Sequence, residues 1–341
     1  MKVLTFVIPA YNSEKFLDKA ISSMLVPEVL DKLEVIVVND GSKDSTAAIA
    51  EKYCVQYPET VKLISQENKG HGGALNTGIA AAAGKYVKVI DADDWVVSEN
   101  LLTFISQLEN CESDVVLTHH HTIDIGTGEI KNWKNYPPVL GKAYTFDEIM
   151  PDWRSFDRSL TFHGITYKTS FYHKYGHQLL EHVFYEDHEY ATYPCCYAKT
   201  VEPFDLFIYE YRVGDITQSV SNVNQLKRLS HTEAVLQRMA DEYGTLSECG
   251  GKHYAAMKIQ GLLLSYLTTA LLVEPDKKAG RLTAKAQMEK RAADVPEAHA
   301  MAKAKYLIFR VLNFLHIGKP TWDAILNSEL YNRIRKNHSF D

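Results

Sequence analysis

The chain has 341 residues, of which 45% are hydrophobic and 23% are charged. This composition is typical of a folded globular protein and excludes a disordered or collagen-like chain. The formal net charge is −6, whereas general nucleic-acid binders are usually basic, so no nucleic-acid partner is expected.

The first 120 residues alternate short apolar runs, typical of buried strands, with stretches of helical apolar spacing. Strands are predicted at 3–8, 34–38, 61–65, 86–90 and 115–118, and helices at 13–25, 44–57, 71–83 and 98–108. This alternation with short turns predicts an α/β fold with a Rossmann-like, mostly parallel sheet and helices on both faces. Residues 120–200 are less regular, a further strand is predicted at 206–211, and the chain becomes helical from about 222.

Polar side chains follow the predicted strands at their carboxyl ends. The residues concerned are Pro9, Ala10, Tyr11 and Asn12 after the first strand, Asp40 after the second, Lys69 after the third, and Asp91, Ala92, Asp93 and Asp94 after the fourth. The carboxyl ends of parallel strands lie along one edge, where ligands bind in such folds. We therefore expect these residues to converge on one crevice.

Asp91, Asp93 and Asp94 place three carboxylates within four residues. Such a cluster repels itself unless a cation or solvent neutralises it, and hard oxygen ligands suit Mn²⁺ or Mg²⁺. An acidic turn in which Asp94 caps a helix would explain the same residues. Their position after a buried strand and beside Asp40 favours a metal site.

Four motifs in register resemble a known family. VIPAYN, VVNDGSKDST, ENKGHGGALNTGIAAAAGKYV and DADD are similar, in order and spacing, to the inverting family-2 glycosyltransferases of GT-A fold. YEDHEY at 185–190 resembles the Glu-Asp motif of that family, and YEYR at 209–212, followed by Ser219 and Ser221, resembles its closing motif. The resemblance covers residues 1–222, with a donor-binding half at 1–118 and an acceptor half at 119–222. A helical region at 223–341 lies outside it.

The resemblance implies roles for individual residues. Asp93 and Asp91 would ligate the Mn²⁺ or Mg²⁺ ion that bridges the diphosphate of a nucleotide sugar, and Asp187 would be the general base with Glu186 beside it. Many family members carry an arginine where this chain has Leu75, so Lys69 is the candidate for neutralising the phosphates. The donor, expected to be a UDP-sugar, would be bound by Pro9, Ala10, Tyr11, Asn12, Asp40, Lys69, Asn76, Asp91 and Ala92.

The implied reaction transfers a sugar, with inversion, to a hydroxyl of a glycan, glycolipid or wall-polymer acceptor. The metal would stabilise the charge of the leaving diphosphate, and Asp187 would take the proton of the acceptor hydroxyl. Two alternatives stay open. One is a non-catalytic nucleotide-sugar-binding subunit of another transferase. The other is a sugar-phosphate nucleotidyltransferase, although that class usually has a Gly-rich loop where this chain has residues 9–12.

Two further features carry no assigned role. His119, His120 and His121 are consecutive, so on a strand they alternate between faces and cannot easily ligate one ion, although one could line the donor pocket. Five aromatic residues of the irregular region could either stack on sugar faces or belong to the core. They are Trp133, Tyr136, Trp153, Phe156 and Tyr167.

The C-terminal region differs in charge from the rest of the chain. Residues 255–341 contain 14 Lys and Arg against 8 Asp and Glu, a net of +6, which leaves −12 for residues 1–254. Residues 303–336 interleave basic with aromatic and aliphatic residues. This pattern predicts helices that contact a membrane peripherally, pack on the rest of the chain, or join two copies in a homodimer.

Cysteine usage and hydrophobic runs indicate the compartment. The five cysteines are odd in number and form no CxxC motif, so reduced thiols fit better than a disulfide framework. The N-terminal apolar run is short and ends at Pro9, unlike a signal peptide. The most apolar stretch, 261–273, falls short of the roughly 20 residues that span a bilayer. We expect a cytoplasmic chain, at most peripheral at the inner face of the cell membrane.

Overall fold

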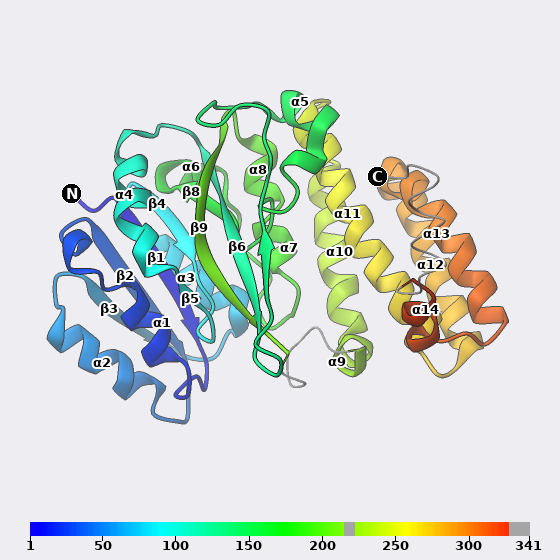
Figure 1. The fold of residues 1–341 in the computed structure, drawn as a ribbon. Coiled ribbons are helices and arrows are strands. Elements are labelled where there is room, and N and C mark those ends of the chain that lie inside the picture. The colour runs from blue at the N-terminus through cyan, green and yellow to red at the C-terminus, as the bar shows by residue number, and fades with distance from the viewer. Residues whose placement is uncertain (215–221, 327–341) are drawn as a thin grey trace. The chain divides into compact units, whose positions relative to one another are not determined.

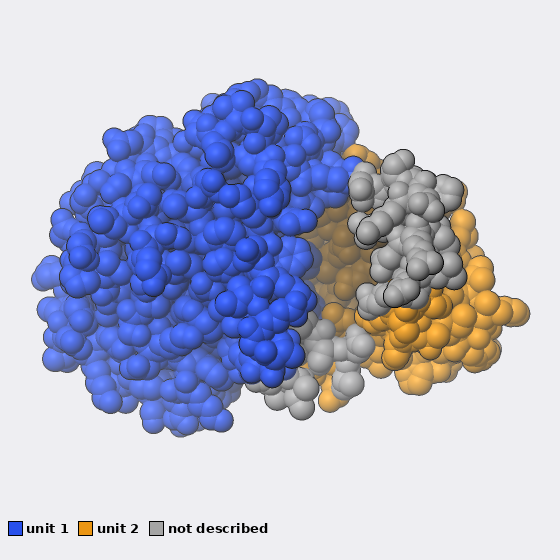
Figure 2. Space-filling view, in the orientation of Figure 1, with its two compact units in different colours: residues 1–218, 246–255 blue, residues 219–245, 256–341 orange. Residues whose placement is uncertain are grey.

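The computed structural model describes residues 1–214 and 222–326. The chain divides into two compact units (Figure 2). Unit 1 comprises residues 1–218 and 246–255, and unit 2 comprises residues 219–245 and 256–341. Ser219, Ser221 and the part of the basic segment beyond residue 326 lie outside the described residues.

Four parallel strands of unit 1 lie side by side in the order β3-β2-β1-β4 (Figure 1). They are β1 (Leu4–Ala10), β2 (Leu33–Asp40), β3 (Val61–Gln66) and β4 (Tyr86–Val89). β1 and β2 are buried along their whole length, as expected for strands covered on both faces. The apolar runs in the sequence predict all four strands close to these bounds.

Helices cover both faces of this parallel part. They are α1 (Leu17–Met24), α2 (Thr46–Gln56), α3 (Gly70–Ala81) and α4 (Leu101–Asn110). Phe6 and Ile8 of β1 share one core with apolar residues of α1 and α4. Between them, Val7 points to the other face and meets Gly78 of α3, where an added Cβ would lie 2.3 Å from Val7 Cγ1. The glycine thus lets α3 pack directly onto β1.

Beyond β4 the sheet becomes mixed, and its order continues β8-β6-β9-β5 with β7 paired to β6. These strands are β5 (Trp95–Val96), β6 (Val115–Asp124), β7 (Ile130–Trp133), β8 (Ile165–Lys168) and β9 (Val201–Val213). β6 and β9 run parallel, whereas β8 is antiparallel to β4 and β6, and β5 and β7 are antiparallel to their partners. The α/β fold class with helices on both faces is confirmed. The sheet is more mixed than predicted, because β5, β7 and β8 are too short to show periodicity in the sequence.

Short helices connect the strands of this mixed part. They are α5 (Phe146–Ile149), α6 (Thr169–Tyr175), α7 (Asp187–Tyr190) and α8 (Tyr193–Tyr197), with 3₁₀ turns at Pro27–Val29, Ser98–Asn100 and Met150–Ser155. α7 matters most for the site, since it begins at Asp187.

Unit 2 is helical, which confirms the predicted helical C-terminal region. Its helices are α9 (Asn222–Lys227), α10 (Leu229–Tyr243), α12 (Lys277–Asp294), α13 (Pro296–Phe314) and α14 (Lys319–Leu326), together with most of α11 (Gly250–Thr268) and its π-helical extension Thr269–Val273. Arg291 of α12 is fully buried and donates to the Leu236 carbonyl at 2.8 Å and to Gln237 Oε1 at 2.7 Å. Both terminal nitrogens of this buried cation thus donate to α10, and Nη2 also lies 3.1 Å from Asp294 Oδ2 of α12, so the guanidinium ties α12 to α10.

α11 and its extension, Gly250–Val273, form one helix that is long and apolar enough to cross a membrane by length and composition, with a mean hydropathy of 1.4 over 18 residues. Within unit 1, Tyr254 of α11 is buried and donates to the Ala191 carbonyl at 2.7 Å. In all, 56% of the apolar window is buried inside the protein. A buried core helix can also be this long and this apolar, and we interpret α11 as such a helix.

Candidate active site

The aspartate cluster lies in the loop between β4 and β5, as predicted. One ligand atom from each of Asp91, Asp93 and Asp94 lies within 4.8 Å of the others. Asp94 is buried, and its two oxygens accept from the Tyr209 hydroxyl at 2.6 Å and from the Arg212 backbone N–H at 2.7 Å. Asp94 therefore anchors the loop to β9, which leaves Asp91 and Asp93 as the better metal ligands.

Asp93 shows how strongly this loop concentrates negative charge. Burial and the charge of Asp91 together raise the pKa of Asp93 to about 6. The nearest positive group is the Arg212 guanidinium, with Nη1 at 3.6 Å from Asp93 Oδ2. A divalent cation would relieve this repulsion, and two carboxylates with room for phosphate oxygens suit Mn²⁺ and Mg²⁺ alike. The residues present thus fit the expected metal.

His71, in the first turn of α3, joins this cluster to the expected base. Its Nε2 lies 2.8 Å from Asp91 Oδ1, and its Nδ1 lies 2.5 Å from Glu186 Oε1. Burial alone would lower the pKa of His71, but the charges of Asp91 and Glu186 raise that pKa well above its ordinary value. The two carboxylates therefore favour the protonated imidazole, in which each ring nitrogen can donate to one of them.

Sequence reasoning missed His71. The available signal was a histidine in the Gly-rich segment at the ligand-binding edge of the sheet. Its partner Glu186 lies 115 residues away, so the bridge itself could not be read from spacing.

Glu186 and Asp187 lie at the start of α7. Glu186 is buried, and burial raises its pKa. Asp187 is half-buried. Burial lowers the pKa of His163 to about 4, although the charges of Asp91 and Asp187 act in the opposite direction. Burial also raises the pKa of Tyr211, as do the charges of Asp91 and Asp187. Asp187, the expected base, and Asp91 of the aspartate cluster therefore both influence the pKa values of His163 and Tyr211.

The segment 179–186 that carries Glu186 is fixed by α3. Asn76 donates from Nδ2 to the Leu179 carbonyl at 3.0 Å and accepts from the Leu179 N–H at 2.9 Å. The His182 N–H donates to the Lys69 carbonyl at 2.9 Å. Asn76 thus has a positioning task, and its role as a donor contact stays a prediction.

Glycines allow the close approach of this segment. Gly70 has φ +78°, and an added Cβ would lie 2.8 Å from the His182 nitrogen. At Gly72 an added Cβ would lie 2.3 Å from the Leu180 carbonyl oxygen. The Gly-rich motif therefore serves packing between α3 and residues 180–182. The Lys69 ammonium nearby is half exposed and lies 3.8 Å from Glu181 Oε1.

The predicted nucleotide side also converges at the ends of β1 and β2. Asp40 is buried, and its Oδ1 accepts from Gln66 Nε2 at 2.7 Å and from the Lys69 N–H at 2.9 Å. Asn12 Oδ1 accepts from the Lys43 N–H at 2.8 Å, which joins the loops after the two strands. Pro9 and Ala10 pair with β2, Tyr11 is exposed, and Ala92 is buried beside the aspartates. Their contacts with a donor stay predictions.

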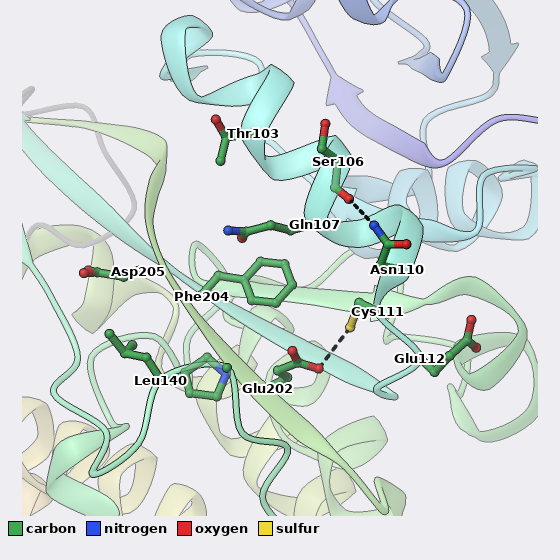
Figure 3. A pocket seen from close by; sticks show the side chains of 12 residues that line it. Thr103, Ser106, Gln107, Asn110, Cys111, Glu112, Leu140, Glu202, Phe204 and Asp205 are labelled. Carbon is green, nitrogen blue, oxygen red and sulfur yellow. Dashed lines mark hydrogen bonds between the residues drawn. The ribbon is translucent and has the colours of Figure 1, made fainter.

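A separate pocket of about 580 Å³ lies between α4 and the start of β9 (Figure 3). Its lining includes Gln107, Asn110 and Phe204, and Cys111 Sγ lies 3.2 Å from Glu202 Oε2. None of its lining residues was predicted as a site residue. None of them belongs to the site described above either, so the pocket is separate from it.

Comparisons with known proteins show the family of the chain. Residues 5–184, about half of the chain, match glycosyl transferase family 2. The chain is 31% identical over 150 residues to glycosyltransferase GlyG of Streptococcus pneumoniae, a match covering 43% of this chain and 47% of GlyG. It is 28% identical over 141 residues to glycosyltransferase GlyA of the same species, covering 41% of this chain and 19% of GlyA. The chain therefore spans about half, or less, of the length of these relatives.

The fold is similar to that of S. aureus TarS residues 1–349, solved in complex with UDP-GlcNAc. The TM-score is 0.64 at 17% sequence identity, over 92% of this chain and 90% of that one. This likeness shows a GT-A glycosyltransferase fold, and the family match covers the aspartate cluster and the Gly-rich motif. The chain belongs to glycosyl transferase family 2.

Proposed function

We propose that the chain is an inverting glycosyltransferase. It moves a sugar from a nucleotide diphosphate, expected to be UDP, to a hydroxyl of a glycan, glycolipid or wall-polymer acceptor. The observation that carries this proposal is the bridge from Asp91 through His71 to Glu186. It joins the expected metal side and the expected base side into one site.

Names of similar proteins support the substrate classes. S. aureus TarS, which shares the fold, was solved with UDP-GlcNAc. A stretch of 127 residues is 32% identical to the minor teichoic acid biosynthesis protein GgaB of Bacillus subtilis. A stretch of 155 residues is 30% identical to chondroitin synthase of Escherichia coli. These names support a nucleotide-sugar donor and a polymeric acceptor.

Different residues of the chain have different tasks in the proposed reaction. Asp91 and Asp93 would hold the divalent ion, which when bound stabilises negative charge on the leaving diphosphate. Asp187 would take the proton of the acceptor hydroxyl as that oxygen attacks the anomeric carbon. Glu186, held by His71, fixes the start of α7 and thereby the position of Asp187. A single displacement from the face opposite the nucleotide inverts the anomeric configuration.

A thermal-shift panel tests the donor and the metal together. Nucleotide sugars are added with and without Mn²⁺, and the donor that fits should raise the melting temperature by mass action. Hydrolysis or transfer of that donor, dependent on Mn²⁺, would separate a catalyst from a non-catalytic binding subunit. Absence of any shift across uridine, guanosine and thymidine donors would contradict the proposal.

The C-terminal helices offer a surface for a second partner. On α13 the side chains of Ala302, Tyr306 and Phe309 are buried, so this face belongs to the core of unit 2. The opposite face is apolar but exposed, at positions spaced as one helical stripe. It comprises Leu307, Ile308, Val311, Phe314 and Leu315, with exposed fractions from 47% to 72%.

We propose that this stripe lies on an anionic membrane surface. Lys303, Lys305 and Arg310 of α13 are exposed around it, and the net charge of +6 for residues 255–341 complements anionic lipid. The odd number of cysteines without a CxxC motif favours a reducing compartment, so we propose that this contact is made at the cytoplasmic face.

Liposome flotation decides between the occupants of the stripe. The full chain should float with phosphatidylglycerol vesicles but not with phosphatidylcholine alone, and Val311→Glu should abolish flotation. Leu282→Glu on α12, another exposed apolar position (62%), is the control and should still float. A dimer that Val311→Glu dissociates, without any vesicle binding, would assign the stripe to a second copy instead.

A further inference from the structure

The three consecutive histidines of β6 point to two different faces of the sheet. His119 and His121 share one face with carboxylates, since His119 Nε2 lies 3.0 Å from Asp205 and His121 Nδ1 lies 3.0 Å from Glu210. His120 points to the other face. In the sheet register it pairs with Trp133 of β7 on one side and Tyr209 of β9 on the other. The face of His120 is also that of the site, because the Tyr209 hydroxyl donates to Asp94.

Four aromatic rings on this face form a continuous column. Tyr211 stacks on His163 with ring centroids 4.2 Å apart, and His163 stacks on His120 at 5.1 Å. His120 in turn stacks on Trp133 at 5.8 Å with an interplanar angle of 3°. The column starts at Tyr211, next to the charges of Asp91 and Asp187. It therefore leads from the reacting centre to β7.

Stacking, rather than hydrogen bonding, holds the middle of the column. His120 is 4% exposed, and its Nδ1 has no hydrogen-bond partner among the described residues. Burial lowers the pKa of His120 to about 2, so its ring is neutral at physiological pH. Neutral aromatic rings in such inclined or offset stacks attract one another, so the column holds together without hydrogen bonds to His120 Nδ1.

Trp133 ends the column at the surface. Trp133 is 40% exposed although its ring stacks on His120. The indole Nε1 donates to Thr122 Oγ1 at 3.2 Å, which fixes the plane of the ring. All residues of β7 are exposed, and the polar Lys131 and Asn132 lie between Ile130 and Trp133 in the strand. A lipid-binding patch needs contiguous apolar surface, which this alternation does not provide.

We propose that Trp133 is a stacking platform for a saccharide ring of the acceptor. A pyranose has one face of C–H groups that packs on an aromatic face and a rim of hydroxyls that bond to polar neighbours. The rings of His120, His163 and Tyr211 connect this platform to the surroundings of Asp187. The acceptor is therefore a glycan, with a sugar ring bound on the β7 side of the base. This inference rests on the proposed function and names the substrate class of the same site.

Ligand-observed NMR on the full chain tests the platform, with neutral trisaccharides as probes (maltotriose, cellotriose and chitotriose). Spectra are recorded with and without UDP and Mn²⁺. At least one trisaccharide should receive saturation transfer, and Trp133→Ala should weaken its affinity roughly tenfold, about 1.4 kcal/mol. Trp133→Phe keeps an aromatic face and should retain most of the affinity. Tyr136→Ala, at a 67% exposed ring outside the column, is the matched control and should bind as the parent does.

Calorimetry with UDP and Mn²⁺ accompanies these measurements. Unchanged UDP affinity in Trp133→Ala, with weaker trisaccharide binding, supports the platform and rules out misfolding. Equal trisaccharide binding by Trp133→Ala and the parent, or no binding of any trisaccharide by the parent, overturns it. Failure of the parent to bind any nucleotide diphosphate contradicts the proposed function instead, and the trisaccharide titrations without UDP still decide the platform.

Discussion

The two sides of the site are built in different ways. On the nucleotide side, Asp40 and Asp91 follow directly from two parallel strands, so the sheet itself sets their positions. On the base side, Glu186 precedes the short helix α7 and Asp187 begins it, after a segment where His182 and Tyr185 have φ of +57° and +75° without being glycines. Such backbone persists only where its surroundings determine it.

The contacts from α3 supply those surroundings. Asn76 and the Lys69 carbonyl hold the backbone of residues 179 and 182, and His71 holds Glu186. The base side therefore takes its geometry from the nucleotide side. Substitutions should therefore separate into those that affect one side and those that uncouple the two.

The largest effect is expected from Asp187→Asn, which affects the base side alone. Without the base, turnover should fall by about 10²–10⁴-fold, while the carboxylates of the metal side are untouched. Transfer kinetics measure the fall in turnover. Calorimetry with UDP and Mn²⁺ should give the same affinity as for the parent. Asp31→Asn, at an exposed carboxylate, is the control. Turnover close to that of the parent would show that another group is the base.

Asp93→Asn affects the nucleotide side alone. Metal ligation needs the carboxylate form, and the pKa of Asp93 is raised to about 6, so Mn²⁺ affinity of the parent should fall as the pH drops through 6. The raised pKa also means that ionised Asp93 opposes folding at pH 7 when no metal is present. The variant should therefore melt higher than the metal-free parent and gain nothing from Mn²⁺. If Mn²⁺ stabilises the variant as much as it stabilises the parent, Asp93 is not a ligand of the metal.

His71→Ala uncouples the two sides. It leaves Glu186 buried without its donor, and an unsatisfied buried group costs about 1–3 kcal/mol of unfolding free energy. Turnover should fall by roughly tenfold, about 1.4 kcal/mol in the activation barrier. His71→Gln retains a donor and should recover part of the loss at the same UDP affinity. Turnover of His71→Ala close to that of the parent would mean that the bridge has no catalytic consequence. Chemical denaturation and transfer assays measure both effects.

The smallest effect concerns stability alone. Lys88 of β4 is fully buried and donates to the carbonyls of His163 at 2.7 Å and Ile165 at 3.1 Å. Burial lowers its pKa to about 7, whereas the unfolded chain keeps the ordinary value of 10.5. The unfolded state then binds the extra proton between these values, so stability should rise as the pH increases from 7 towards 10. Denaturation of Lys88→Met should show a weaker rise, and an identical rise would exclude Lys88 as its origin.

The sequence predicted the nucleotide side better than the base side for a physical reason. Long apolar strands can be recognised from their composition. Asp40 and the aspartate cluster lie at the carboxyl ends of parallel strands and therefore along one edge of the sheet. β5, β7 and β8 are two to four residues long and are stabilised by pairing with strands far away in sequence. The antiparallel β8 between β4 and β6 was therefore not predicted.

The same limit applies to individual residues. Glu186 and Asp187 were found through the family resemblance, whereas their isolated pattern is also that of a helix N-terminus. The His71 bridge and the hydrogen bonds between Asn76 and Leu179 join segments more than 100 residues apart in the sequence. The aromatic platform needed the strand register, which sends His120 and its neighbours to opposite faces.

Asp40 constrains how donor preference can change in this enzyme. Its carboxylate receives the Lys69 N–H, and the next residues begin α3 and include His71. The residue that we propose to hold the nucleobase therefore also contacts the start of the helix that carries the bridge. Exchanging Asp40 to admit a different base would shift that helix as well, so redesign of the donor would need compensating changes around Gln66 and Lys69.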